Sequence, residues 1–172
     1  LSFGFADRQY VAVSVEIRKE KGESFSPLKG MLRNYEIMYV IADERDVIEL
    51  RANHRKNDVY LYPVNTSKEN MRTLFVDMLT RANNLKEEPE FYNTLTNTCT
   101  TNIASHINNM SPNKIPWDLR LLAPKNSDVL AHELGLVDNS ITLEELRAKH
   151  LINPQANKHK NDPDFSRLIR QR

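Results

Sequence analysis

The chain has 172 residues, of which 40% are apolar and 27% are charged, and its formal net charge at pH 7 is +1. These values are typical of a globular domain that buries a core, and they favour neither a nucleic-acid nor a membrane surface as partner. Only 4 glycines are present, and no P-loop or dinucleotide fingerprint occurs, so no nucleotide cofactor is expected. No apolar run is long enough to span a bilayer.

The first part of the chain predicts strands and one helix. Residues 10–17 (YVAVSVEI) alternate between two faces and, together with residues 1–5, predict a β-hairpin. Residues 35–42 predict a second strand, and residues 59–64 a short strand that Pro63 confines to an edge. Between these two strands, residues 43–58 predict a helix that Asp43 can cap.

The second part predicts helices. One begins at Ser67, with an apolar stripe at helical spacing formed by Met71, Leu74, Phe75, Met78, Leu79, Ala82 and Leu85. Others are expected at about 99–109, over 127–134 with Gly135 closing it, and after Ser140 or Thr142. These elements predict an α+β domain over residues 1–150, with a small antiparallel sheet and helices packed on it. Residues 151–172 are expected to form a polar, basic and loosely packed tail.

Cys99, the chain's single cysteine, stands where an Asn- and Thr-rich loop turns into a predicted helix. A helix N-terminus favours the thiolate form and lowers the thiol pKa. The placement therefore suits a cysteine nucleophile, and backbone N–H groups there could stabilise an oxyanion. The alternative is a small buried core residue, because free cysteines are often buried.

A cysteine nucleophile needs a base, normally histidine. His106 shares a side of the helix with Cys99 but lies about 10 Å along the axis, too far for a hydrogen bond. The other four histidines suit solvated or hydrogen-bonded roles. No metal site is expected, because the sequence lacks H-x-x-x-H, H-E-x-x-H and Cys/His clusters.

The chain also opens abruptly. It has no initiator Met and starts within a strand-like pattern, LSFGFADRQYVAVSVEIRKE. We therefore expect an N-terminally truncated fragment of a longer protein.

Several segments, in order, resemble the Lnb N-terminal periplasmic domain family, a bacterial family named after an intramolecular lipoprotein acyltransferase. The most specific are SVEIRKEKGE and NTLTNTCTTNI, and the resemblance extends from Leu1 to about Leu136. It implies a circularly permuted, papain-like fold of the NlpC type. Cys99 matches the family's cysteine, and the family's histidine would precede Leu1.

The resemblance also suggests further site residues. Glu16 is the candidate for orienting the histidine; the alternative is a solvent-facing Glu paired with a nearby Arg or Lys. Where the family commonly has Asn-Asn-Cys, this chain has Asn97-Thr98-Cys99. Asn97 and Thr98 are the candidates for binding the substrate or an oxyanion. Thr98 can still cap the helix, but it replaces the second Asn of the family pattern.

The resemblance implies an envelope cysteine-dependent hydrolase or acyltransferase that forms an acyl-Cys99 intermediate on an amide or (thio)ester carbonyl. The expected partner is an acylated or peptide substrate on the periplasmic side of the membrane, and a membrane-associated parent protein is compatible with this. Without its histidine the fragment itself is expected to be inactive. Two alternatives remain, a non-catalytic envelope binding domain and a cytosolic domain with a structural cysteine.

Overall fold

The computed structural model describes residues 1–22, 24, 26–32, 34–122 and 124–171. The chain divides into two compact units. Unit 1 comprises Leu1–Val13, Ile41–Asn65 and Gly135–Arg172, and unit 2 comprises Ser14–Val40 and Thr66–Leu134. A three-stranded antiparallel sheet and about eight helices confirm the predicted α+β class.

The sheet has the strand order β1-β2-β3, formed by β1 (Ser2–Gly4), β2 (Tyr10–Arg18) and β3 (Glu36–Asp43). β1 and β2 pair in antiparallel fashion, with Phe3 opposite Val11, which confirms the predicted hairpin. Their connection turns through Asp7 and Arg8, whose φ angles are 63° and 60°.

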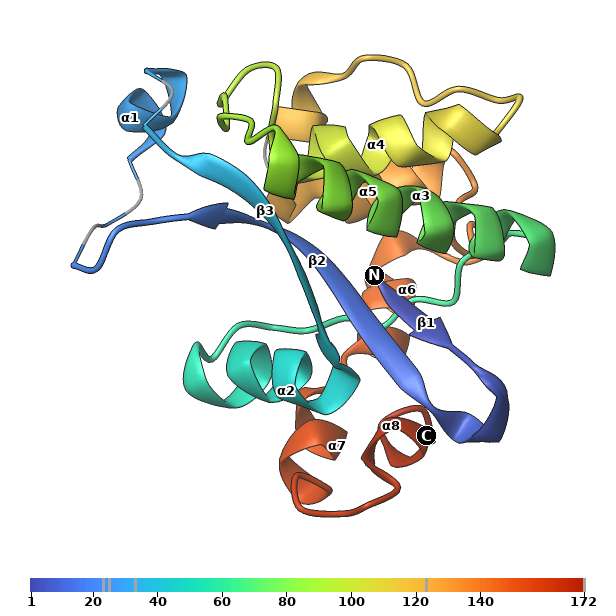
Figure 1. The fold of residues 1–172 in the computed structure, drawn as a ribbon. Coiled ribbons are helices and arrows are strands. Elements are labelled where there is room, and N and C mark those ends of the chain that lie inside the picture. The colour runs from blue at the N-terminus through green and yellow to red at the C-terminus, as the bar shows by residue number, and fades with distance from the viewer. Residues whose placement is uncertain (23, 25, 33, 123, 172) are drawn as a thin grey trace. The chain divides into compact units, whose positions relative to one another are not determined.

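Unit 1 contains four of the helices that Figure 1 labels. α2 (Glu44–Glu49) begins where predicted, because the Asp43 carboxylate accepts the Arg45 N–H, and it continues as a π-helix over Leu50–His54. α6 (Leu143–His150), α7 (Asn153–Lys158) and α8 (Phe165–Leu168) follow later in the chain. The core of this unit consists of Ile48, Ala52, Ile152, Ala156, Phe165 and Ile169.

Two expectations for unit 1 are wrong. Residues 59–64 form no strand; they make only an isolated bridge, Tyr60 to Leu151. The segment of the chain around residue 151 is too short to extend that bridge into a ladder, because α6 ends before it and α7 begins after it. The described part of the expected tail, residues 151–171, is not loosely packed either, since Phe165 and Ile169 are each 1% exposed. Their i, i+4 spacing puts both side chains on one side of a helical turn.

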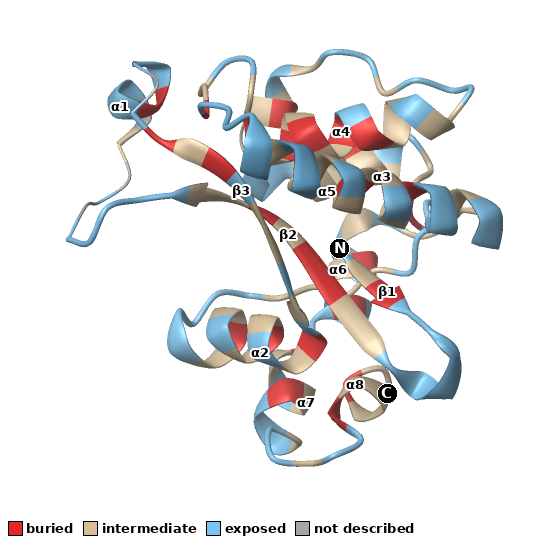
Figure 2. Ribbon diagram, in the orientation of Figure 1, coloured by how far each residue is buried: buried red, intermediate tan, exposed pale blue. Residues whose placement is uncertain are grey.

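Unit 2 contains α1 (Pro27–Met31), α3 (Lys68–Glu87), α4 (Cys99–Met110) and α5 (Ser127–Glu133). α3 starts at Ser67 as predicted, where the hydroxyl accepts the Asn70 N–H. α3 and α4 lie side by side (Figure 1) and contact each other. The predicted stripe of α3 is buried at Leu74 and Met78, and exposed residues of α3 face outward (Figure 2).

A second core cluster packs one side of α4 against neighbouring segments. It joins Ala104 to Leu121 and Leu130, with Ile115 packed against it. Leu121 belongs to a 3-10 helix over Leu119–Leu122, and Leu130 to α5. This cluster fixes one side of α4, so that its other side is available for the polar groups described next.

Candidate functional site

Cys99 is the first residue of α4, as the sequence predicts. Thr98 is the N-cap: its hydroxyl accepts the Thr101 N–H at 3.1 Å, and the Thr101 hydroxyl accepts the Thr98 N–H at 2.8 Å. Thr98 is 0% exposed, and its hydroxyl also contacts the Leu121 carbonyl at 3.0 Å. This reciprocal capping box satisfies two backbone donors at the helix start.

The loop before Cys99 is a closed turn. The backbones of Asn93 and Asn97 exchange two hydrogen bonds, of 3.1 and 2.9 Å. The Asn93 side chain accepts the N–H groups of Leu95 and Thr96, which lie inside the turn. Cys99 is therefore preceded by hydrogen-bonded backbone rather than by an open loop.

The residues just upstream of that turn are fixed against β3. The Tyr92 N–H donates to the Tyr35 carbonyl at 2.7 Å, and the Ile37 N–H donates to the Glu90 carbonyl at 2.9 Å. Tyr35 is fully buried. The path of the chain from Glu90 to Cys99 is thus anchored at both ends.

The Cys99 thiol is half-buried and contacts the Thr100 hydroxyl at 3.8 Å. Burial has the largest effect and raises the pKa of Cys99. Hydrogen bonds with Thr100 oppose it in part, and the Glu16 carboxylate adds a smaller increase. This direction is opposite to the lowering predicted from the helix start, because desolvation disfavours the thiolate more than the helix start favours it. The thiol is therefore protonated near neutral pH.

Glu16 lies on β2 and is half-buried, where it accepts a hydrogen bond from the Ser14 hydroxyl at 2.5 Å. The Glu16 charge acts to raise the pKa of Cys99, by less than burial does. Tyr92 is another neighbour: burial and the charge of Cys99 raise the Tyr92 pKa. Cys99 and Glu16, both predicted as site residues, thus lie within electrostatic range of each other.

The other two predicted site residues are engaged in local structure. The Asn97 amide donates to the Phe91 carbonyl at 2.9 Å, and its oxygen accepts from the Asn102 amide at 2.7 Å. Thr98 is used in the capping box, as described above. Asn97 nevertheless lines a surface groove, while the Thr98 side chain lies inside the protein.

His106 lies two turns along α4 and is 2% exposed. Its Nδ1 is 2.7 Å from the Asp77 carboxylate, and its Nε2 is 2.6 Å from the Tyr39 hydroxyl. Burial raises the pKa of Tyr39 to about 12, so this hydroxyl stays protonated and can donate to the imidazole. His106 is therefore a buried, hydrogen-bonded histidine, as expected for one that does not serve Cys99.

Asn102 is the centre of a second set of contacts. Its side-chain oxygen accepts from Arg81 Nε at 3.0 Å, and its amide donates to Asn97 and to the Thr98 carbonyl. The Arg81 guanidinium also binds both Glu90 oxygens, at 3.1 and 2.9 Å. Glu90 in turn accepts from the Asn97 amide at 3.4 Å.

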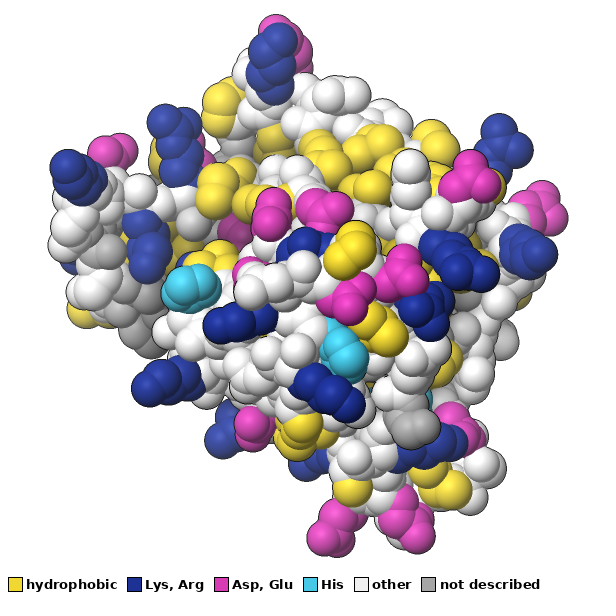
Figure 3. Space-filling view, turned by 90° about the horizontal axis from the view of Figure 1, so that it is seen from below, with side chains coloured by type: hydrophobic (Ala, Val, Ile, Leu, Met, Phe, Trp, Pro, Cys, Tyr) yellow, Lys and Arg dark blue, Asp and Glu magenta, His cyan; other side chains and the backbone are white. Residues whose placement is uncertain are grey.

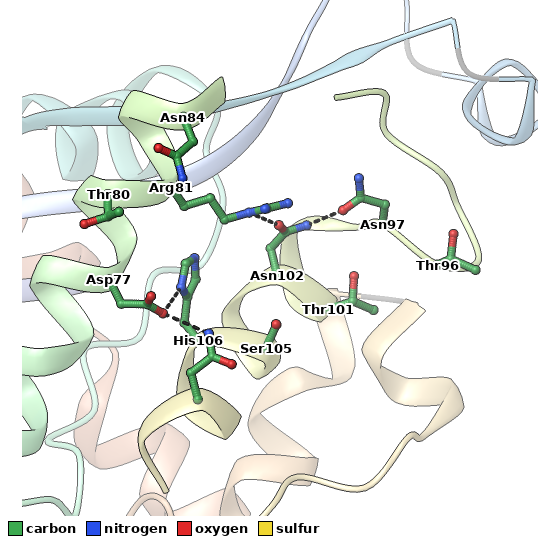
Figure 4. A pocket seen from close by; sticks show the side chains of 11 residues that line it. Asp77, Thr80, Arg81, Asn84, Thr96, Asn97, Thr101, Asn102, Ser105 and His106 are labelled. Carbon is green, nitrogen blue, oxygen red and sulfur yellow. Dashed lines mark hydrogen bonds and ion pairs between the residues drawn. The ribbon is translucent and has the colours of Figure 1, made fainter. Parts of the chain in front are cut away.

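Asn102, Arg81 and Asn97 face a groove between α3 and α4, with a volume of about 340 Å³ (Figure 4). In Figure 4, Arg81 and Asn97 point toward Asn102 from opposite sides, and Asp77 points toward His106. All the lining residues are polar: Asp77, Thr80, Arg81, Asn84, Thr96, Asn97, Thr101, Asn102, Ser105, His106 and Asn109. The lining carries acidic, basic and neutral groups together, so the groove offers hydrogen bonds rather than a field of one sign.

Sequence reasoning missed Arg81, Asn102, Asp77 and Tyr39. A signal for part of this set was present, because Asn102, Ser105, His106 and Asn109 recur at helical spacing on one side of α4. A polar stripe on a helix that is otherwise packed indicates a partner for those side chains. Which residues supply the partner could not be read locally.

Among the described residues, no group of three or more His, Cys, Asp or Glu side chains could hold a metal ion. Of the described helices, none combines the length and apolar character needed to cross a membrane. The face drawn in Figure 3 mixes Lys and Arg with Asp and Glu, in keeping with the net charge of +1.

The fold and the site define an α+β domain with a cysteine at the start of a helix. The sequence matches the family described as the Lnb N-terminal periplasmic domain over residues 1–125, and the chain belongs to this family. The family's description agrees with the predicted periplasmic location. Searches of curated proteins and of solved structures gave no match.

Proposed function

We propose that this domain performs acyl transfer through Cys99, as a hydrolase or acyltransferase of the bacterial envelope. The observation that carries the proposal is the placement of Cys99 at the first position of α4, directly after a hydrogen-bonded turn. The Glu16 charge lies within electrostatic range of the thiol. A cysteine at a helix start has backbone N–H groups near the position of a developing oxyanion.

The reaction consists of two displacements. An imidazole nitrogen takes the Cys99 proton, the sulfur bonds to the carbonyl carbon of an amide or (thio)ester, and the leaving group departs with that proton. Water or an amine then attacks the acyl-Cys99 carbonyl and gives its own proton to the imidazole. The bond from carbonyl carbon to sulfur breaks, and the thiol is restored.

The raised pKa of Cys99 makes a base necessary, because the protonated thiol is a poor nucleophile. In the described part of the chain, the hydrogen-bonding partner of the Cys99 sulfur is Thr100 rather than a histidine. We propose that the imidazole comes from a histidine outside this sequence and lies between Glu16 and Cys99. Glu16 then orients it, as in the triads of papain-like enzymes, and the domain has the circularly permuted papain-like architecture.

The substrate class follows from the same proposal. An acylated or peptide substrate of the cell envelope supplies the carbonyl, and a lipoprotein is one example. The family's periplasmic description supports this location for the reaction.

A second candidate is a non-catalytic binding domain of the envelope. The direction of the Cys99 pKa favours it, since a thiol that stays protonated is not activated in the absence of a base. On this reading Cys99 is a packing residue and the polar groove between α3 and α4 is the binding surface.

The test is to trap the acyl-enzyme. The full-length gene product is mixed with p-nitrophenyl butyrate, p-nitrophenol release is followed, and peptide mass spectrometry locates any butyryl adduct. We expect a burst of p-nitrophenol with the adduct on Cys99. Cys99→Ala should abolish both, and Glu16→Gln should slow the burst about tenfold or more, since triad members act as a unit.

Thr73→Ala, an exposed change on α3, serves as the control and should match the unmodified protein. A folded wild-type protein that gains no adduct on Cys99 would refute the acyl-transfer proposal and favour the binding domain.

A further inference from the structure

We propose that Asn102 is a positioning residue for Cys99, and that Arg81 and Glu90 act with it by closing a ring of hydrogen bonds around the residues before the cysteine. The role of Cys99 as nucleophile rests on the proposed function. The effect of the ring on the position of the thiol is independent of that function, and it can be measured separately.

The Asn102 side chain is 4% exposed, and both of its amide hydrogens are used. One bonds to the Asn97 side-chain oxygen at 2.7 Å and the other to the Thr98 carbonyl at 2.8 Å. Its oxygen faces Arg81 Nε, which can only donate. The orientation of this amide is therefore fixed by its partners, because the flipped amide would oppose donor to donor at Arg81 and acceptor to acceptor at Thr98.

The contacts form a closed circuit. Asn102 binds Asn97, Asn97 binds Glu90, Glu90 binds both terminal nitrogens of Arg81, and Arg81 binds Asn102. The Glu90 carbonyl also accepts the Ile37 N–H, which ties the circuit to β3. A closed circuit resists displacement of any member, since moving one residue strains bonds on both of its sides.

Capping does not require this ring. The capping box between Thr98 and Thr101 already satisfies the backbone donors of both residues, and an ordinary backbone bond links the Asn102 N–H to the Thr98 carbonyl. The Asn102 side-chain bonds are additional and converge on the two residues that precede Cys99. These bonds hold the backbone of Asn97 and Thr98 in one position, and with it the residue that carries the sulfur.

A second set of contacts, through Tyr39 and His106, also holds Asn102. The Tyr39 hydroxyl lies 3.5 Å from the Asn102 oxygen and 2.6 Å from His106, which contacts Asp77. Tyr39 of β3 and Asp77 of α3 thus help to limit the movement of Asn102. Such precision matters for a nucleophile, because a displacement of about 1 Å can cost about a hundredfold in rate.

The principal variant is Asn102→Asp, which keeps the oxygen that accepts from Arg81 and removes the two donors to Asn97 and Thr98. Arg81→Lys opens the ring at an outer position, where one ammonium cannot replace three separate guanidinium contacts. The matched control is Asn83→Asp, the same amide-to-carboxylate change at an exposed position of α3 outside the groove lining. Thermal melting followed by circular dichroism establishes that each variant is folded.

Two readouts are taken on the full-length gene product. The first is the pH profile of Cys99 alkylation by iodoacetamide, with the site identified by peptide mapping. The second is formation of the butyryl adduct on Cys99. We expect Asn102→Asp to move the alkylation midpoint by at least half a pH unit and to slow adduct formation tenfold or more. Arg81→Lys should slow adduct formation about threefold, and Asn83→Asp should leave both readouts unchanged.

The outcomes separate the two proposals. If the wild type forms no adduct, the proposed function fails. Positioning is then supported by a shifted alkylation profile in folded Asn102→Asp and refuted by an unchanged one. If the wild type forms the adduct and the folded Asn102→Asp and Arg81→Lys proteins match it in both readouts, positioning by the ring is refuted while acyl transfer stands.

Discussion

Each unit contains a buried polar cluster, and the two clusters differ in kind. In unit 1, Glu44 is 1% exposed and binds Arg170 through both carboxylate oxygens, at 2.6 and 2.8 Å. In unit 2, Asn102 is equally buried but neutral, and its partners include the two residues before Cys99. The unit 1 cluster is built on one buried charge pair, whereas the unit 2 cluster joins two amides to the partly exposed Arg81–Glu90 pair.

The two clusters also differ in the groups that they contact. Arg170 stacks on the Tyr10 ring at 3.8 Å, and Ser2 contacts both members of the pair, so that distant parts of the chain are held together. The members of this cluster contact one another and the Tyr10 ring, while Arg170 also lines a surface pocket. The Asn102 ring faces a groove on one side and the backbone before a thiol on the other. What sets the unit 2 cluster apart is that Asn102 binds the two residues before Cys99, which is the basis of the positioning role proposed above.

The largest expected effect is loss of the charge pair. Arg170→Met removes the partner of a buried carboxylate, and we expect a loss of about 3–5 kcal/mol in the free energy of unfolding, measured by urea denaturation. Arg167→Met is the control, because the Arg167 pair with Asp164 is solvent-exposed and should contribute less than about 1 kcal/mol. Equal losses in the two variants would contradict the structural role given to Glu44 and Arg170.

The helix caps offer a smaller effect. Thr98 and Thr142 both form capping boxes, but Thr98 is buried and also contacts the Leu121 carbonyl, whereas Thr142 is exposed. We expect Thr98→Ala to cost about 2 kcal/mol and Thr142→Ala about 1 kcal/mol. Urea denaturation checks both values. A larger loss for Thr142→Ala would show that burial adds nothing to the Thr98 cap.

Acid should weaken the unit 1 cluster in particular. Burial acts to raise the pKa of Glu44, but hydrogen bonds from Arg170, Ser166 and Ser2 together lower it below its ordinary value of 4.5. A lowered pKa in the folded state means that this stabilisation is present above pH 4.5 and is lost as pH falls through the folded-state pKa. Denaturation between pH 6 and pH 3 should show falling stability, with a shallower slope in Glu44→Gln. An unchanged slope in that variant would contradict this assignment.

The smallest effect is expected at alkaline pH, in unit 2. Burial raises the pKa of Tyr39 to about 12 from 10.0. Its contribution to stability is complete below pH 10 and is lost as pH rises toward 12, because the unfolded chain ionises first. The absorbance of phenolate at increasing pH should lose its latest-titrating component in Tyr39→Phe. If the component lost in Tyr39→Phe titrates near pH 10 instead, burial does not raise the pKa of Tyr39.

The parts of the fold that depend on neighbouring residues were predictable from the sequence. The caps at Asp43, Ser67 and Thr98 use side chains within three positions of their partners, and all three helices begin there. The alternation of residues 10–17 predicted β2 in the same way. The segment 59–64 failed because strand formation needs a partner, and its composition does not say whether one is available.

In the candidate site too, features set by neighbouring residues were predictable and features that depend on distant residues were not. Cys99 was recognisable at its helix start, and the family resemblance indicated Glu16, but the direction of the Cys99 pKa depends on how deeply the chain buries the thiol. The packing of Phe165 and Ile169 likewise depends on α2 and its neighbours.

By itself the sequence determined the helix starts, the hairpin and the position of Cys99, because capping and strand alternation act over a few residues. Only the tertiary structure decided which polar groups meet. Arg81 reaches Asn102 from another helix, and Glu44 and Arg170 are 126 positions apart. Such pairs form when packing excludes water and leaves each buried group to find a partner in the protein, a requirement that the whole fold satisfies and no local pattern specifies.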